Sequence, residues 1–492
     1  MMKRHVAVIL LASMLLPLLA SCGEPSSSNL PGTQSAETQP AETQPAENQP
    51  AENETFETEL TDNLPEKSFS GADYKILAAA EQWQRFYLRE ELIGEVMNDA
   101  VFERNLAVED RFDVKLQYRL FNGYTAGMAD VKNALSGSVM SGGGDYDLFV
   151  GSSSYVIGQI GDKMFSNLDE ADYLDLKAPW WFQYVNDELR INNKQYLGAG
   201  SLNMLNYAWA IVMYFNQNIA RDFQLGDLYS IVNEGNWTWD TFTQMADAVV
   251  TDVDGNGKYD ANDIVGVYST ADYFAFLMNS FDYEDSTHND DGTITINPIT
   301  DKLASINERL YVVMNSNMYM NRESADYSPM QRDYAAGHAL FMYHRLEFTD
   351  TDYLRNMDGY GILPSPKYDE QQENYKTAVV SEVSVIPSVV TDMEMSAMIL
   401  EALQYETWKT VRPAYYDIAL KTKYSQDEAS GQMLDIIFDN LTASFSYMYS
   451  RIIGGYPGDT LGQNEAYAST FARYLKVWQK KLDALMVTLQ EE

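Results

Sequence analysis

From residue 70 onward, short apolar runs of strand length alternate with longer stretches that carry the apolar period of a helix. Residues 74–78 and 114–118 fit strands, and the segment between them fits a helix with one apolar face, formed by Ile93, Met97, Ala100, Val101 and Val108. Strands that alternate with helices are typical of an α/β fold with a largely parallel sheet. This alternation is the strongest constraint on the fold.

The same alternation continues through the rest of the chain. We predict further strands at 145–150, 206–216, 337–343, 359–363 and 377–386. Thr391 to Glu394 forms a capping box, and the helix after it has an apolar stripe made of Met395, Met398, Ile399, Ala402 and Leu403. The remainder to Glu492 is predicted to be mainly helical. A chain of 492 residues is too long for one compact core, so at least two lobes are expected.

The N-terminus has the features of an export signal. A basic pair, Lys3 and Arg4, precedes an apolar run over 6–20, which is too short to span a bilayer comfortably. Residues 19–22 read Leu-Ala-Ser-Cys and resemble the lipobox of bacterial lipoprotein precursors, in which the cysteine thiol receives diacylglycerol. We therefore predict a signal peptide over 1–21, lipidation of Cys22 and a location at the outer face of the cell membrane. The alternative is a simple secretory signal with a stray cysteine.

The segment 22–66 is of low complexity and rich in Pro, Glu, Gln and Ser. It cannot bury enough apolar surface to fold, so we predict a disordered acidic tether. The formal net charge of the chain is −38, and a field of that sign repels nucleic acid and anionic lipid. We expect no nucleic-acid partner and contact with the membrane only through the lipid anchor. Since Cys22 is the single cysteine, the folded part has no disulfide.

A calcium-loop pattern occupies residues 252–263. Oxygen-bearing side chains stand at positions 1, 3, 5, 9 and 12 of the pattern, and Gly257 stands at position 6, where such loops turn sharply. The last position holds Asp in place of the usual Glu. We predict structural Ca²⁺ bound by Asp252, Asp254, Asn256, the backbone carbonyl of Lys258, Asp260 and Asp263. The alternative is an Asp- and Gly-rich surface turn without metal.

Several sequence blocks together resemble the extracellular solute-binding proteins of bacterial ABC importers, in the family that includes maltose-binding protein. No single block is diagnostic, and the resemblance rests on their order and spacing: GEVMNDA at 94–100 with ERN at 103–105, 145–150, YFN at 214–216, NWTWD at 236–240, GYGILPSPK at 359–367 and PAYY at 413–416.

The resemblance implies a two-lobed periplasmic-binding-protein fold of type II, with a ligand cleft between the lobes. It implies that residues 67–210 and 375–425 form lobe 1 and that residues 211–374 and 426–492 form lobe 2. A monomer would then capture a small solute, with a sugar or oligosaccharide the leading candidate, and deliver it to an ABC permease. The runs 206–216 and 377–386 would cross between the lobes.

Candidate ligand-binding residues lie where strands end toward the predicted cleft. Aromatic rings stack on the apolar face of sugars, and carboxylates and hydroxyl groups bind sugar hydroxyls. The candidates are Trp83, Ser153, Tyr207, Trp209, Tyr343, His344, Glu382, Ser384 and Tyr416. For each of them, simple core packing is the alternative. Trp180, Trp181, Trp237 and Trp239 are instead predicted to be anchors of the core or of a lobe surface.

Known catalytic motifs are missing from the sequence. No Gly-x-Ser-x-Gly elbow, His-Glu-x-x-His pair or phosphate loop occurs, and after removal of the signal only His288, His338 and His344 remain as histidines. We therefore predict that the protein is not an enzyme and has no catalytic cofactor. A glycoside hydrolase needs only two carboxylates, so a cell-surface glycosidase stays open, as does a surface binding protein without a transport role.

Overall fold

The computed structural model describes residues 60–78, 85–121, 127–324, 326–357, 359–380, 382–421, 428–462 and 466–490. Leu60–Glu492 form one compact unit, distinct from Met1–Glu59. Cys22 and Trp83 lie outside the described residues. The folded unit begins earlier than predicted, since Asp62, which we assigned to the tether, is buried and its Oδ2 lies 2.6 Å from Arg111 Nη1.

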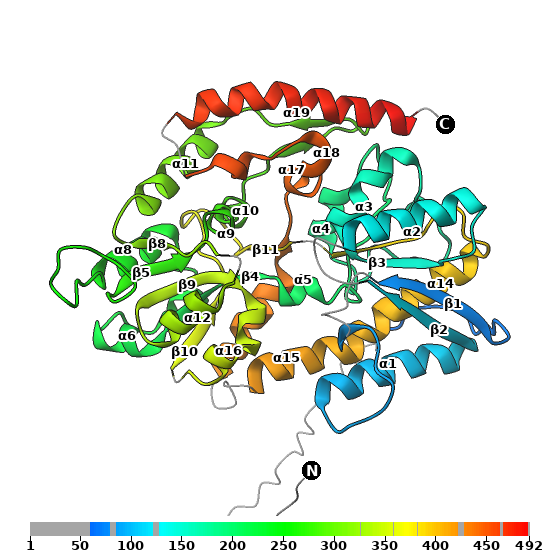
Figure 1. Ribbon diagram of the computed structural model, residues 1–492, viewed down its shortest axis with the longest axis horizontal. Coiled ribbons are helices and arrows are strands. Elements are labelled where there is room, and N and C mark those ends of the chain that lie inside the picture. Colours follow the sequence, from blue (N-terminus) through cyan, green and yellow to red (C-terminus); the bar gives the residue numbers. More distant parts are fainter. Residues whose placement is uncertain are drawn as a thin grey trace, which may run out of the picture. The chain divides into compact units, whose positions relative to one another are not determined.

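Lobe 1 is built on a four-stranded sheet with the order β12-β3-β1-β2 (Figure 1). The strands are β1 (Ala72–Ala78), β2 (Val114–Leu120), β3 (Leu148–Ser152) and β12 (Glu382–Val385). β1 pairs in parallel with both β2 and β3, whereas β12 runs antiparallel to β3 because the chain enters it from the other lobe. One face of this sheet is covered by helix α14 (Met393–Glu406), where the Tyr74 hydroxyl donates to the Ser396 carbonyl at 3.0 Å.

Lobe 2 is built on a five-stranded sheet with the order β10-β4-β9-β5-β8. Its strands are β4 (Ile211–Asn216), β5 (Val265–Ser269), β8 (Tyr319–Asn321), β9 (Ala339–Arg345) and β10 (Tyr360–Leu363). β5 pairs in parallel with β8 and β9, and the crossing strand β4 is antiparallel to β9 and β10. Helix α8 (Trp239–Ala248) packs so closely on β5 that a Cβ on Gly266 would lie 2.6 Å from the Ala246 carbonyl oxygen, so only glycine fits there.

The other strands form two small pairs. These are β6 (Ser286–His288) with β7 (Ile294–Ile296), and β11 (Thr377–Ala378) with β13 (Leu441–Thr442). The remaining helices are α1 (Val96–Phe112), α2 (Gly127–Ser141), α3 (Ser153–Val156), α4 (Gln183–Leu189), α5 (Leu205–Ala208), α6 (Gln217–Asp222), α7 (Leu228–Asn233), α9 (Ala271–Ala275), α10 (Leu277–Ser280), α11 (Asp301–Met314), α12 (Ser328–Ala335), α13 (Asp352–Arg355), α15 (Arg412–Lys421), α16 (Glu428–Asp439), α17 (Phe445–Met448), α18 (Ser450–Ile453) and α19 (Tyr467–Gln490).

Among the described elements from β1 to α16, the chain passes between the two sheets three times. It leaves lobe 1 between β3 and β4, returns between β10 and β12, and leaves again between α15, which packs on α1, and α16, which packs on β10. The first two crossing segments are held together by hydrogen bonds. Asn206 Nδ2 donates to the Glu382 carbonyl at 2.9 Å, and the Glu382 N–H donates back to Asn206 Oδ1 at 2.7 Å.

The structure corrects the predicted strand at 206–216. Residues 205–208 form the short helix α5, and the strand begins only at Ile211. An apolar run without alternation fits a buried helix as well as a buried strand, so its composition could not separate the two. The predicted strand at 377–386 also divides in two, because its first part pairs with β13 and its second part with β3.

Two details at helix starts also differ from prediction. Ile93 precedes α1 and is exposed, so it does not belong to the apolar face of that helix. The N-cap of α14 is Asp392, whose Oδ1 accepts from the Met395 N–H at 2.9 Å, and not Thr391. The apolar stripe of α14 and the four tryptophans predicted as anchors are all buried, as expected. None of the described helices is long and apolar enough to cross a membrane.

Candidate functional site

Polar and aromatic side chains lie at the strand ends along one edge of the lobe 2 sheet. β9 ends at Arg345, and β5 ends at Ser269 just before the helix that carries Tyr273. Because β4 runs antiparallel to β9, the residue Trp209, which precedes β4, reaches the same edge. Ligands of open α/β sheets bind beyond the carboxyl ends of the parallel strands, so this edge is the candidate site.

Arg345 is the centre of this edge. Its guanidinium lies 5.3 Å from the ring centre of Trp209, 5.8 Å from Tyr273 and 5.7 Å from Tyr327. Its Nη2 is 2.9 Å from Glu347 Oε1, and the Trp209 indole donates to Glu347 Oε2 at 3.0 Å. Burial raises the pKa of Glu347, although the charge of Arg345 acts in the opposite direction. The arrangement holds a planar cation and a carboxylate rigidly among aromatic rings.

His344 is buried directly beneath this group. Its ring is stacked between Tyr273, at 4.0 Å, and Phe348, at 4.2 Å. Within the described part of the chain neither ring nitrogen has a hydrogen-bond partner, and burial holds the pKa of His344 well below its usual value. The imidazole therefore acts here as a neutral packing ring that supports Tyr273.

Lobe 1 contributes the segment that follows β1. Arg85 Nη1 lies 2.5 Å from Oδ2 of Asp350 in lobe 2, so an ion pair joins the two lobes. The backbone beside Arg85 is held by the fully buried Arg104, which donates to the carbonyls of Phe86, at 3.1 Å, and Tyr87, at 2.9 Å. The ERN block at 103–105 is thereby explained, because Arg104 fixes a segment that reaches the other lobe.

Two aromatic rings near this edge are partly accessible to solvent. Tyr327 lies beside Arg345, and Tyr447 of α17 packs edge-on against Phe276 with ring centres 4.9 Å apart. Phe276 in turn contacts Tyr273 at 5.9 Å. Partly exposed aromatic rings next to charged hydrogen-bonding groups are suited to a ligand that has both an apolar face and hydroxyl groups.

Glu382 occupies the start of β12 at the crossing between lobes. It is fully buried, accepts a hydrogen bond from the Tyr87 hydroxyl, and accepts another from the Leu205 N–H at 3.1 Å. Burial raises the pKa of Glu382 to about 7. Glu382 thus connects the segment after β1 to both crossing segments.

Trp83 lies outside the described residues, and five further predicted ligand residues are engaged by contacts within the protein. The Ser153 hydroxyl lies against Met448 Sδ at 3.8 Å, Tyr207 OH is 3.2 Å from Ser201 Oγ, and Tyr343 OH is 3.0 Å from Ser365 Oγ. Ser384 Oγ accepts from Asn203 at 3.1 Å, and the half-buried Tyr416 donates to the Gly431 carbonyl at 2.6 Å. Of the nine candidates, Trp209 and His344 join the Arg345 group. Direct ligand contact stays a prediction for all nine.

A separate pocket of about 250 Å³ lies between α4 and the segment that follows α10. It is strongly acidic, since Asp187, Glu188, Asp282, Glu284 and Asp285 all line it. Burial and the neighbouring Asp285 raise the pKa of Glu188 to about 8, and burial raises the pKa of Asp285 to about 6. At neutral pH this pocket therefore offers both donors and acceptors to hydroxyl groups.

The calcium-loop pattern folds so that three of its acids converge. Side-chain oxygens of Asp252, Asp254 and Asp263 all lie within 4.8 Å of one another, and Asp263 is fully buried. Backbone N–H groups already point at these carboxylates, with Gly257 N–H 2.8 Å from Asp252 Oδ2. Asp260 is not part of the group, and its Oδ1 accepts from the Asn262 N–H at 2.9 Å. The donor set of hard oxygens fits Ca²⁺.

Sequence reasoning missed Arg85, Tyr273, Tyr327, Arg345 and Glu347. Arg345 and Glu347 directly follow the predicted strand at 337–343, so their position after a strand was an available signal. The pairing of Arg85 with Asp350 had no such signal, because 265 residues separate the two.

The sequence matches no protein-family model and no curated protein. Solved structures do match. The sugar-binding protein MalE of Xanthomonas citri is 10% identical with a TM-score of 0.58, over 86% of this chain and 100% of that one. The galacto-N-biose-/lacto-N-biose I-binding protein of a Bifidobacterium longum ABC transporter, in complex with lacto-N-biose, is 10% identical with a TM-score of 0.55. The match covers 85% of this chain and 98% of that one.

A third match is the cyclic alpha-maltosyl-1,6-maltose binding protein of Arthrobacter globiformis, which is 11% identical with a TM-score of 0.55, over 85% of this chain and 99% of that one. This chain therefore has the two-lobed α/β fold of the MalE-like sugar-binding proteins, as the sequence blocks predicted.

Proposed function

We propose that this chain is a lipid-anchored extracellular solute-binding protein that captures a sugar or oligosaccharide between its lobes and delivers it to an ABC permease. The observation that carries the proposal is the Arg345 group. It places an arginine, a carboxylate and partly accessible aromatic rings at the strand ends of lobe 2, next to an ion pair with lobe 1. The shared fold with sugar-binding proteins supports the sugar class.

Binding between two lobes requires no chemistry on the ligand. A sugar that contacts both lobes binds the closed arrangement more tightly, and that difference in affinity shifts the balance between open and closed forms. The crossing segments around Glu382 and Asn206 are the hinge of this motion. Small-angle scattering at saturating ligand is expected to show a smaller radius of gyration.

The test is a thermal-shift screen of the purified protein against mono- and oligosaccharides. A ligand at 100 times its Kd adds about 2.7 kcal/mol to the free energy of unfolding, which is easily detected. Tyr327→Ala and Tyr447→Ala are each expected to weaken the best ligand about fivefold, because each removes a ring worth roughly 1 kcal/mol of stacking. Tyr474→Ala is the matched control, since Tyr474 is an exposed ring on α19.

Two results would contradict the proposal. One is the absence of a shift with every sugar tested. The other is sustained hydrolysis of an oligosaccharide by the pure protein that one carboxylate substitution abolishes, which would favour the glycosidase alternative.

We also propose that the loop at 252–263 binds one structural Ca²⁺. The convergence of Asp252, Asp254 and Asp263 supports this, because three carboxylates within 4.8 Å repel one another without a counter-ion. The ion would order a surface loop of lobe 2 and take no part in ligand binding.

A further inference from the structure

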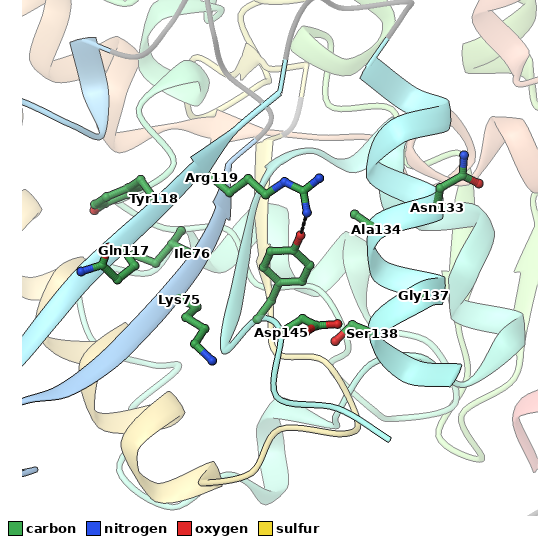
Figure 2. A pocket seen from close by; sticks show the side chains of 11 residues that line it. Lys75, Ile76, Gln117, Tyr118, Arg119, Asn133, Ala134, Gly137, Ser138 and Asp145 are labelled. Carbon is green, nitrogen blue, oxygen red and sulfur yellow. Dashed lines mark hydrogen bonds between the residues drawn. The ribbon is translucent and has the colours of Figure 1, made fainter. Parts of the chain in front are cut away.

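Lobe 1 contains a pocket of about 470 Å³ that the proposed sugar site does not use (Figure 2). We call it the lobe-1 pocket. Residues of β1, β2, α2 and the turn before β3 line it, and none of the residues that line it belongs to lobe 2. Its volume falls in the range that accommodates small molecules.

Two cationic side chains reach the lobe-1 pocket from neighbouring strands. Lys75 of β1 pairs in register with Gln117 of β2, and Leu77 pairs with Arg119. Because side chains alternate along a strand, Lys75, Gln117 and Arg119 lie on one face of the sheet. The opposite face carries Tyr74 and packs on α14.

Neither cation has a carboxylate within ion-pair distance among the described residues. Lys75 Nζ donates to the Gly144 carbonyl at 2.7 Å. Arg119 donates to the Tyr146 hydroxyl, and its guanidinium lies 5.8 Å from the Tyr146 ring centre. In a chain with 72 acidic and 34 basic residues, a pocket lined by two cations outside any ion pair and by one acid, Asp145, favours an anionic ligand.

The helix side of the pocket offers space and one unused polar group. Ser138 is 1% exposed, and its Oγ has no hydrogen-bond partner among the residues that the structure describes, although buried hydroxyl groups normally have one. Figure 2 shows Ala134 and Ser138 on the side of α2 that faces Arg119 and Asp145. The neighbouring Gly137 borders open space, because a Cβ added there would meet no atom within 4 Å.

Asp145 restricts the kind of anion. Its carboxylate also lines the pocket, so it repels a ligand of high negative charge but accepts hydrogen bonds from hydroxyl groups. We propose that the lobe-1 pocket binds a small hydroxylated carboxylate, such as a hexuronate, whose carboxylate is held by Arg119 and Lys75 and whose hydroxyl groups meet Ser138 and Asp145. A planar guanidinium suits a carboxylate in particular.

The experiment is calorimetric titration of the purified full chain with D-glucuronate, D-glucose and inorganic phosphate. Glucuronate is expected to bind at least tenfold more tightly than either of the others. Arg119→Gln is expected to weaken glucuronate at least tenfold. Arg473→Gln should leave glucuronate binding unchanged, since the exposed Arg473 also lies over a tyrosine ring, 4.9 Å from the ring centre of Tyr474, but on α19 and outside the lobe-1 pocket.

Ala134 supplies the test of location, because it lines the pocket and lies on the side of α2 that faces Arg119 in Figure 2. Ala134→Leu fills part of the pocket with a residue type that favours helices, so the protein should keep its melting temperature while binding is lost. Met140→Leu, at an exposed position of the same helix outside the pocket, should bind within twofold of wild type. No binding of glucuronate, equal binding of glucose, tighter binding of phosphate, or binding that survives Ala134→Leu would each overturn the proposal.

Discussion

Arg85 and Asp350 form an ion pair that connects the two lobes, with Arg85 Nη1 2.5 Å from Asp350 Oδ2. Their side chains are 34% and 30% exposed, so the pair is only partly shielded from water. Such a pair contributes at most about 1 kcal/mol to overall stability. The pair matters for the arrangement of the lobes, because it connects lobe 2 to the segment after β1, whose backbone Arg104 holds in lobe 1.

The first prediction concerns this ion pair. Arg85→Gln is expected to increase the radius of gyration of the ligand-free protein, since one contact that holds the lobes together is lost, while the free energy of unfolding changes by less than about 1 kcal/mol. Arg355→Gln is the control, because Arg355 pairs with Asp350 and Asp352 within lobe 2. Equal scattering curves for Arg85→Gln and wild type would show that the pair does not restrain the lobes.

The second prediction concerns pH. Glu401 is fully buried and accepts both indole N–H groups of Trp180, at 2.8 Å, and Trp181, at 2.9 Å, and burial raises its pKa to about 7. An acid whose pKa is raised on folding stabilises the folded protein while it is protonated. This contribution to the free energy of unfolding is complete below the unfolded pKa, near 4.5, and is lost as the pH rises through the folded pKa.

The free energy of unfolding is therefore expected to fall between about pH 4.5 and about pH 7, with the buried Glu382 adding to the effect. Glu401→Gln should flatten this dependence, and Glu308→Gln, at an exposed position on α11, should not. Urea unfolding followed by tryptophan fluorescence measures both. The same slope in Glu401→Gln as in wild type would show that Glu401 does not titrate in this range.

The third prediction concerns calcium. Calorimetry is expected to show one Ca²⁺ bound by wild type and none by the double variant Asp252→Ala with Asp254→Ala, because both carboxylates belong to the convergent group. Chelation should lower the melting temperature without abolishing sugar binding. The control is the double variant Asp222→Ala with Asp352→Ala, which removes two exposed acids elsewhere. Equal heats for the two double variants would place the ion at another site.

The fourth prediction concerns the anchor. Cys22→Ser is expected to move the protein from the membrane fraction to the soluble fraction without changing its melting temperature, since Cys22 belongs to Met1–Glu59 and not to the compact unit Leu60–Glu492. Fractionation of cells that produce each form measures this. Retention of Cys22→Ser on the membrane would contradict lipidation at this residue.

Features that depend on neighbours in the chain could be predicted from sequence. The strand predicted at 114–118, which the structure extends to Leu120, and the apolar stripe of α14 follow from period alone. The twelve-residue spacing of 252–263 brings three of its acids together through local turns. The prediction of a strand over the whole of 206–216 was wrong at its start, because residues 207–215 form an apolar run without alternation, and such a run has no period that separates strand from helix.

Tertiary structure decided which distant side chains meet. Trp180 and Glu401 are separated by 221 residues, and Arg85 and Asp350 by 265, so only the packing of the lobes brings them together. The same packing placed Tyr343 and Glu382 in the interior, although both stand at the strand positions that the sequence marked. A strand's period determines the face on which a side chain lies, but the element that covers that face comes from elsewhere in the chain, and it decides whether the side chain is buried or accessible.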